Sequence, residues 1–227
     1  MKYLLLCFIV VLTSCSKDPR IEKFEAVLGA DNVETLNFMV TDFEDDFLKR
    51  QYPEMKTEAA YKQFLTELAA GKTEHWQKVS ENARDRFAQS ELRMQIYKVM
   101  DSVWLVNDST VKIPVLGPAL RKRMKFIDHK GQIDYTVSER SHLPEDLVSQ
   151  EELNERYKNF VSSNAIGSYM RALQTIADSS DFVSEFYEVK NAAGILSTEL
   201  IAEQMLKNEV DLNDYFIKRI IIAEIVY

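Results

Sequence analysis

Three histidines are the residues of this chain most suited to acid–base or metal chemistry. His75, His129 and His142 are the only histidines in 227 residues. No two of them stand four residues apart and no HExxH motif occurs, so their spacing does not indicate a zinc site. Serine catalysis needs a nucleophile, a base and a residue that orients the base, but no GxSxG motif is present. We therefore predict no catalytic residue, no metal and no cofactor; His75, beside Trp76, is the histidine to examine first.

The densest group of acids lies between Asp42 and Asp46. A calcium-binding loop needs oxygen ligands at alternate positions and a glycine at its turn. This stretch contains no glycine, and Phe43 and Phe47 stand four residues apart, which is typical of a helix. We therefore interpret the acids as one solvent-exposed face of a helix and predict no metal site there.

A basic run stands out because the chain as a whole is acidic. It consists of Arg121, Lys122, Arg123 and Lys125, in a protein with 28 Lys and Arg, 36 Asp and Glu and a net charge of −8. Such a run can bind phosphate groups or an acidic partner. It can equally be a solvated strand or helix end that pairs with the protein's own carboxylates. We treat these four residues as a candidate interaction patch, while the overall acidity argues against general nucleic-acid binding.

The first fifteen residues indicate export from the cytoplasm. Lys2 precedes an apolar run over residues 3–12, which is shorter than the roughly 20 residues of a membrane-spanning helix and has the length of a signal-peptide core. The following segment, Leu12 to Cys15, resembles the lipobox of bacterial lipoproteins. This resemblance covers only the export segment, and it implies that residues 1–14 are removed and that Cys15 carries the lipid. Ser16 stands where an aspartate would imply retention at the inner membrane, so the resemblance favours the outer membrane of a Gram-negative bacterium.

The alternative for this segment is an ordinary secretory signal that ends near a cysteine by chance, and it too places the domain outside the cytoplasm. Cys7 and Cys15 are the only cysteines, so the folded domain is predicted to contain no disulfide and no cysteine metal ligand. We expect a tether over residues 15–20 and a single domain over residues 21–227, which is long enough to bury a substantial core.

Most of the domain shows the periodicity of amphipathic helices. A capping box at Asp31 to Glu34 is predicted to open a helix that ends before Pro53. Residues 74–103 are predicted to form one long helix or two joined helices, and a second capping box is predicted at Ser149 to Glu152. Further helices are expected over 166–176, from Phe182 to Gly194 and after Ser197. The last helix is predicted to be capped by Asp211 and to run over residues 212–227, buried at the centre of the domain.

Residues 102–140 break this helical pattern with two prolines and two glycines. One interpretation is a pair of β-hairpins, the first joining residues 103–106 to 111–113 and the second joining 124–128 to 133–137. The other is a long loop followed by a helix after Pro118. The predicted fold class is therefore mainly α, a multi-helix globular domain, with a small β-hairpin insertion around 102–140 under the first interpretation.

These observations favour a lipid-anchored, non-enzymatic module of the cell envelope that binds another protein or an envelope component. Two alternatives stay open: a hydrolase that acts on an envelope polymer or lipid through scattered acids and a histidine, and an immunity or inhibitor lipoprotein that neutralises a toxin. An enzyme should gather acids and a histidine in a concave pocket. A binding protein should expose an apolar patch or groove, with the basic run as a candidate border.

Overall fold

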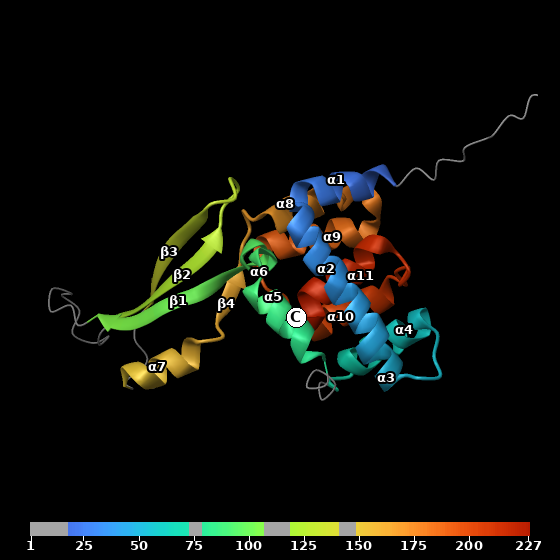
Figure 1. Ribbon diagram of the computed structural model, residues 1–227, viewed down its shortest axis with the longest axis horizontal. Coiled ribbons are helices and arrows are strands. Elements are labelled where there is room, and N and C mark those ends of the chain that lie inside the picture. The colour runs from blue at the N-terminus through green and yellow to red at the C-terminus, as the bar shows by residue number, and fades with distance from the viewer. Residues whose placement is uncertain (1–17, 73–78, 107–118, 141–148) are drawn as a thin grey trace, which may run out of the picture.

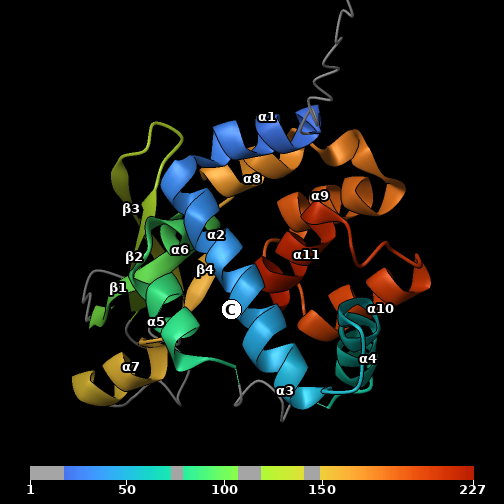
Figure 2. The ribbon, with the colours of Figure 1, turned by 45° about the vertical axis from the view of Figure 1, so that its right-hand side comes forward.

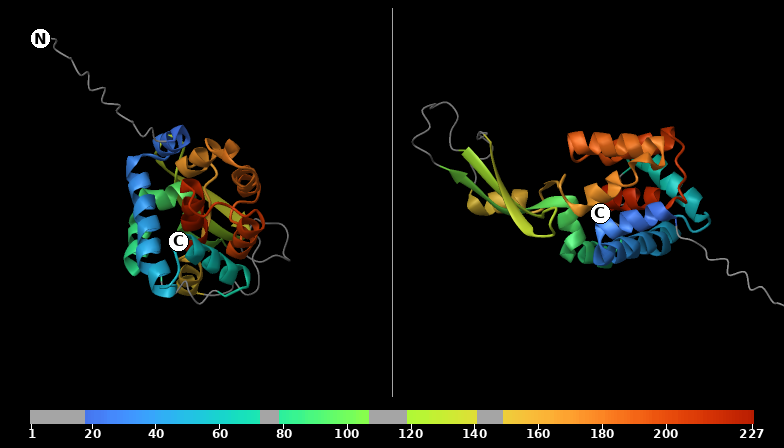
Figure 3. Two further views of the ribbon diagram at one scale, coloured as in Figure 1. Left: turned by 90° about the vertical axis from the view of Figure 1, so that its right-hand side faces the viewer. Right: turned by 90° about the horizontal axis from the view of Figure 1, so that it is seen from above.

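The computed structural model describes residues 18–72, 79–106, 119–140 and 149–227. These residues form a helical body from which a small antiparallel sheet projects (Figures 1 and 3). The prediction of a mainly α fold with a β insertion is confirmed. The α-helices are α1 (Pro19–Leu28), α2 (Ala30–Asp42), α3 (Lys49–Gln51), α4 (Thr57–Ala69), α5 (Glu81–Gln89), α6 (Glu91–Ile96), α7 (Gln150–Tyr157), α8 (Ser168–Gln174), α9 (Asp181–Ala193), α10 (Thr198–Lys207) and α11 (Tyr215–Ile221).

The first helix begins inside the segment that was predicted to be a tether. α1 starts at Pro19 because the Asp18 carboxylate accepts a hydrogen bond from the Arg20 amide (2.8 Å), and proline suits the first helical position. α2 then starts directly after Gly29, whose φ of +90° separates it from α1. The capping box predicted at Asp31 is therefore wrong, since Asp31 already lies within the first turn of α2.

α2 continues through a π-helical segment, η1 (Phe43–Leu48), into α3. The Phe43 and Phe47 rings stack with their centroids 4.9 Å apart, and Phe64 of α4 meets the Phe43 ring edge-on at 5.2 Å. These rings are buried, so the apolar stripe predicted for this helix is confirmed. The wider π turn keeps both phenylalanines on the side of the core and turns most of the acids outward.

The last helix is central, as predicted, but it begins later. Asp214 caps α11 by accepting from the Phe216 and Ile217 amides, so the prediction that Asp211 is the cap is wrong. The helix ends in a second π-helical segment, η5 (Ile222–Val226). Ile220, Ile221 and Ile222 are fully buried or nearly so, and α11 lies between α2 on one side and α9 and α10 on the other (Figure 2).

The predicted helix over residues 74–103 is wrong in its second half. α5 and α6 bury Phe87, Leu92 and Ile96 as the pattern predicts, but the chain becomes extended at Tyr97. It continues as β1 (Tyr97–Val106), which pairs with β2 (Ala119–Ile127) and β4 (Val161–Ser163). β1 therefore pairs with strands that are distant in sequence, which helical spacing could not reveal.

The sheet has the antiparallel strand order β3-β2-β1-β4. The second predicted hairpin is confirmed: β2 pairs with β3 (Ile133–Arg140), and Met124 stands opposite Thr136. Its turn is held by Asp128, whose carboxylate accepts from the amides of Lys130 and Gln132, both at 2.8 Å. The first predicted hairpin needs residues 111–113, which lie outside the described residues, and β1 pairs with β2 along the described part of its length.

A buried joint fixes the sheet to the helical body. Asn164, fully buried just after β4, donates from its side chain to the carbonyls of Met94 and Ile127, both at 2.8 Å. Its backbone amide donates to Ile96, and the Ser168 amide donates to the side chain of Gln95 at 2.6 Å. These bonds connect α6, β2, β4 and α8, so they set the position of the sheet.

Candidate functional site

The basic run lies on β2, and the alternation of a strand divides it between the two faces of the sheet. Arg121, Arg123 and Lys125 point to one face and Lys122 to the other. The Lys122 ammonium lies 4.1 Å from the ring centroid of Phe160, and its burial, with the nearby charge of Arg140, lowers its pKa. The candidate patch therefore consists of three residues on one face of the sheet, whereas Lys122 lies on the other face, beside Phe160.

The face that carries Lys122 is covered by α7, which lies against β1 (Figure 1). The predicted capping box at Ser149 opens this helix and is confirmed. Leu153 of α7 packs with Val103 and Leu120 in a small second core, and the Gln150 side chain donates to the Val103 carbonyl at 2.7 Å. The helix ends at Tyr157, and Val161 starts β4.

On the opposite face of the sheet, side chains of β2 and β3 are exposed to solvent. The side chains of Arg121 and Arg123 are 40% and 44% exposed. Arg121 pairs with Glu139 on β3 at 2.7 Å, and Arg123 pairs with Asp101 at 3.4 Å while its guanidinium lies 4.1 Å from the Tyr135 ring centroid. Exposed pairs of this kind contribute only about 0–1 kcal/mol, so a partner's carboxylate can replace the internal one at little cost.

The edge strand β3 adds an exposed apolar row to this open face. Ile133, Tyr135 and Val137 alternate along the strand and are 54%, 41% and 56% exposed. Among the described strands β3 has β2 as its one neighbour, so its outer edge is unpaired there. Proteins normally protect such an edge with charged side chains, above all lysine, or with proline or a bulge. β3 contains charged residues but neither lysine nor proline, and its middle part is apolar on the open face. The apolar–polar alternation of residues 133–137 is a strand signal, but it does not show that the apolar side of the strand stays exposed.

The other residues considered for chemistry do not converge on a site within the described chain. No group of three or more His, Cys, Asp or Glu residues there is arranged to hold a metal ion. Glu44 pairs with Lys218 at 2.7 Å, and Asp45 pairs with Lys49 at 2.6 Å. His129 is exposed in the β2–β3 turn, where its backbone carbonyl accepts from Arg171. His75 and His142, like Cys15, lie outside the described residues.

Comparisons with other proteins add no assignment. No protein-family model matches the chain, and searches of curated proteins and of solved structures find no match. Within the described residues, no helix has the length and apolar character needed to cross a membrane. The open face of the sheet, bounded by Arg121, Arg123 and Lys125 on β2 and by the apolar row on β3, is the candidate functional site.

Proposed function

We propose that the protein is a non-enzymatic binding module of the bacterial cell envelope, anchored in the outer membrane by a lipid on Cys15. Its open sheet face binds an extended, acidic segment of a partner protein. The observation that carries this proposal is the edge strand β3, with three exposed apolar side chains beside a row of cations. An added strand can pair with the free edge, and its acidic side chains can reach the guanidinium groups of Arg121 and Arg123.

The anchor is tested by replacing Cys15 with alanine. The variant is expected to lose a palmitate label and to move from the membrane fraction to the soluble envelope fraction, because stable anchoring needs two acyl chains or a second signal. Cys7→Ala is the matched control, since Cys7 lies within the segment that the lipobox reading removes. A Cys15→Ala protein that still incorporates palmitate would contradict the anchor.

The binding face is tested by an Ile133→Lys/Val137→Lys variant. Two lysines on the edge strand introduce the protection that natural edges carry, so recovery of the partner by crosslinking in intact envelopes is expected to fall about ten-fold, typical of losing one or two hot-spot contacts. Both residues are exposed, so circular dichroism should be unchanged.

Met55→Lys/Ile166→Lys is the control for this variant, because both of its residues are similarly exposed apolar side chains outside the sheet. A photo-crosslinking amino acid at Val137 should label the same partner, and one at Met55 should not. Equal recovery from both double variants would place the binding surface elsewhere. If the Ile133→Lys/Val137→Lys variant lost binding to lipid phosphates but kept its protein crosslinks, the ligand of this face would be an envelope headgroup and not an acidic protein segment.

A further inference from the structure

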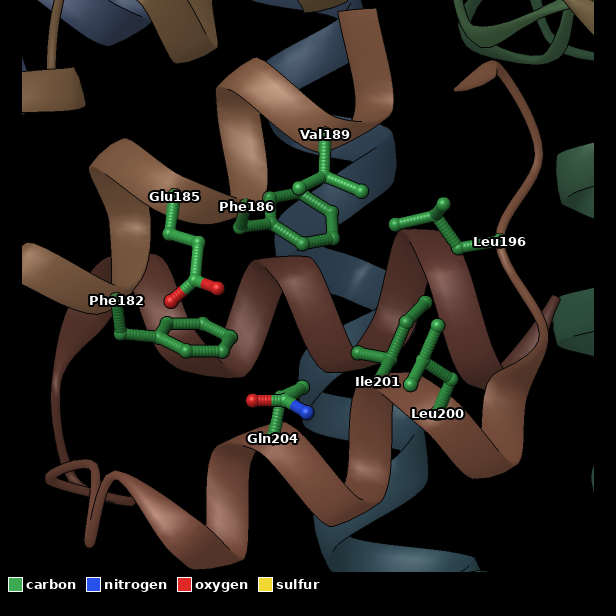
Figure 4. Close-up of a pocket in the computed structure, with 8 residues that line it drawn as sticks. All are labelled: Phe182, Glu185, Phe186, Val189, Leu196, Leu200, Ile201 and Gln204. Atoms are coloured by element: carbon green, nitrogen blue, oxygen red, sulfur yellow. The ribbon is translucent and has the colours of Figure 1, made fainter. Parts of the chain in front are cut away.

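A second apolar surface lies on the helical body, between α9 and α10 (Figure 4). The groove is lined mainly by apolar side chains, namely Phe182, Phe186, Val189, Leu196, Leu200 and Ile201, with Glu185 and Gln204 among them. Phe182, Phe186 and Ile201 are buried and form its floor, whereas Val189 and Leu200 are 40% and 42% exposed at its rim. Its cavity is about 140 Å³, close to the roughly 150 Å³ apolar cavity that accommodates benzene. One side chain of the size of leucine or phenylalanine therefore fits.

The surroundings of the groove are acidic. The exposed acids of α9 and α10 are Asp181, Glu185, Glu188 and Glu203, and none of them forms an ion pair with the described residues. Lys190 of α9 is buried and bonded to Glu224, which leaves Lys207, at the end of α10, as the exposed cation of these two helices. Glu185 lies above the groove between Phe182 and Val189 (Figure 4). The field over this surface therefore favours positive charge.

We propose that the α9–α10 groove binds an amphipathic helix of a partner protein, with one leucine or phenylalanine as the anchor and lysine or arginine at its flanks. The apolar positions of α9, spaced 182, 186 and 189, match the spacing at which a helix docks its own apolar face into such a groove. The anchor supplies affinity and the acids supply orientation and selectivity. This surface is separate from β3, so it does not depend on the binding proposed for the sheet.

The probe for this proposal is a pair of synthetic helical peptides of about 18 residues, long enough to form a helix in water. Both carry the same apolar face with a central phenylalanine; one has lysines at the flanking positions and the other has glutamates. Binding to the full mature domain is measured by calorimetry, and the contacted residues are mapped by amide chemical shifts. The lysine peptide is expected to bind at least about ten-fold more tightly than the glutamate peptide, with an affinity that falls as salt is added.

Two variants locate the site. Leu200→Lys and Glu185→Lys/Glu203→Lys are each expected to weaken binding of the lysine peptide about ten-fold. Glu151→Lys on α7 and Met55→Lys are the charge and apolar controls and should leave it unchanged; all of these residues are exposed. The proposal is overturned if the lysine peptide does not bind, if both peptides bind equally, or if the groove variants bind as the controls do. It is equally overturned if sedimentation shows that a second copy covers the groove and Leu200→Lys makes the protein monomeric.

Discussion

A Gly167→Ala variant is expected to melt about 6–12 °C below the wild-type protein. A Cβ atom on Gly167 would lie 2.0 Å from the Gln95 carbonyl oxygen and 2.8 Å from the Asn164 side-chain nitrogen. Because the nearest atom belongs to the backbone, the alanine can be accommodated only by moving α6 away from the start of α8. Such overpacking costs about 3 kcal/mol, and each kcal/mol lowers the melting temperature of a domain of this size by roughly 2–4 °C.

The control for this variant is Gly71→Ala. Gly71 has a φ of +75° but meets nothing within 4 Å, so alanine there costs only the roughly 1–2 kcal/mol of a left-handed residue. Differential scanning calorimetry compares the two. Gly167→Ala should also loosen the sheet on the body, seen as faster amide exchange around Asn164. A Gly167→Ala protein that melts with or above Gly71→Ala would show that the close approach at this joint does not exist.

The helices that were predicted well are those whose signals are local. Ser197 caps α10 and Gly194 ends α9 with a φ of +82°, both within a few residues of the apolar stripe they bound. The start of α11 shows the limit of such signals. Asp211 does accept a hydrogen bond, from the Asn213 amide, but it forms a turn, while Asp214 caps the helix. Two aspartates three residues apart offer the same local chemistry, and packing of the following residues decides between them.

The sheet was harder to predict because its pairing is not local. Val99 and Val103 fit a helical stripe that begins at Leu92 and Ile96, yet Val103 faces Lys122 across a strand pair nineteen residues away in sequence. Without knowing that partner, the helical interpretation is reasonable. For the same reason the sequence did not show that the basic run is divided between two faces. Consecutive residues such as Lys122 and Arg123 point to opposite faces only in a strand.

The α9–α10 groove could not be predicted at all from single helices. Phe182 and Phe186 on α9 and Ile201 on α10 lie in segments that were predicted to be helices, and all three are buried. Whether such positions are filled by a neighbour or left as a groove depends on how far apart the two helices lie, which sequence periodicity does not contain.

The largest single-residue effect is expected at the buried pair between Lys190 and Glu224. Their side chains are 0% and 4% exposed, and the Lys190 ammonium lies 2.7 Å from a Glu224 carboxylate oxygen. Lys190→Ala would leave the carboxylate buried without its cation, which typically costs about 3–5 kcal/mol. Tyr169 cannot replace the lost cation, because it stays a neutral phenol. Its burial and the nearby charge of Glu224 raise the pKa of Tyr169 well above the ordinary value. Urea denaturation measures the loss as a lower midpoint at an unchanged slope.

A double variant distinguishes the net contribution of the ion pair to stability from the destabilisation caused by removing one partner alone. Lys190→Met/Glu224→Leu replaces both charges by apolar side chains of similar length and is expected to lie within about 1 kcal/mol of wild type, because neither side chain then needs solvation. Lys49→Ala supplies the contrast: its bond to Asp45 is as short, at 2.6 Å, but both side chains are exposed, so the loss of unfolding free energy should stay below about 0.5 kcal/mol.

If Lys190→Ala lowers the free energy of unfolding no more than Lys49→Ala does, water must reach Glu224, and α9 does not pack closely against η5. If instead the double variant is as unstable as Lys190→Ala, the ion pair is needed to hold α9 against the end of the chain, and with it the α9 wall of the groove.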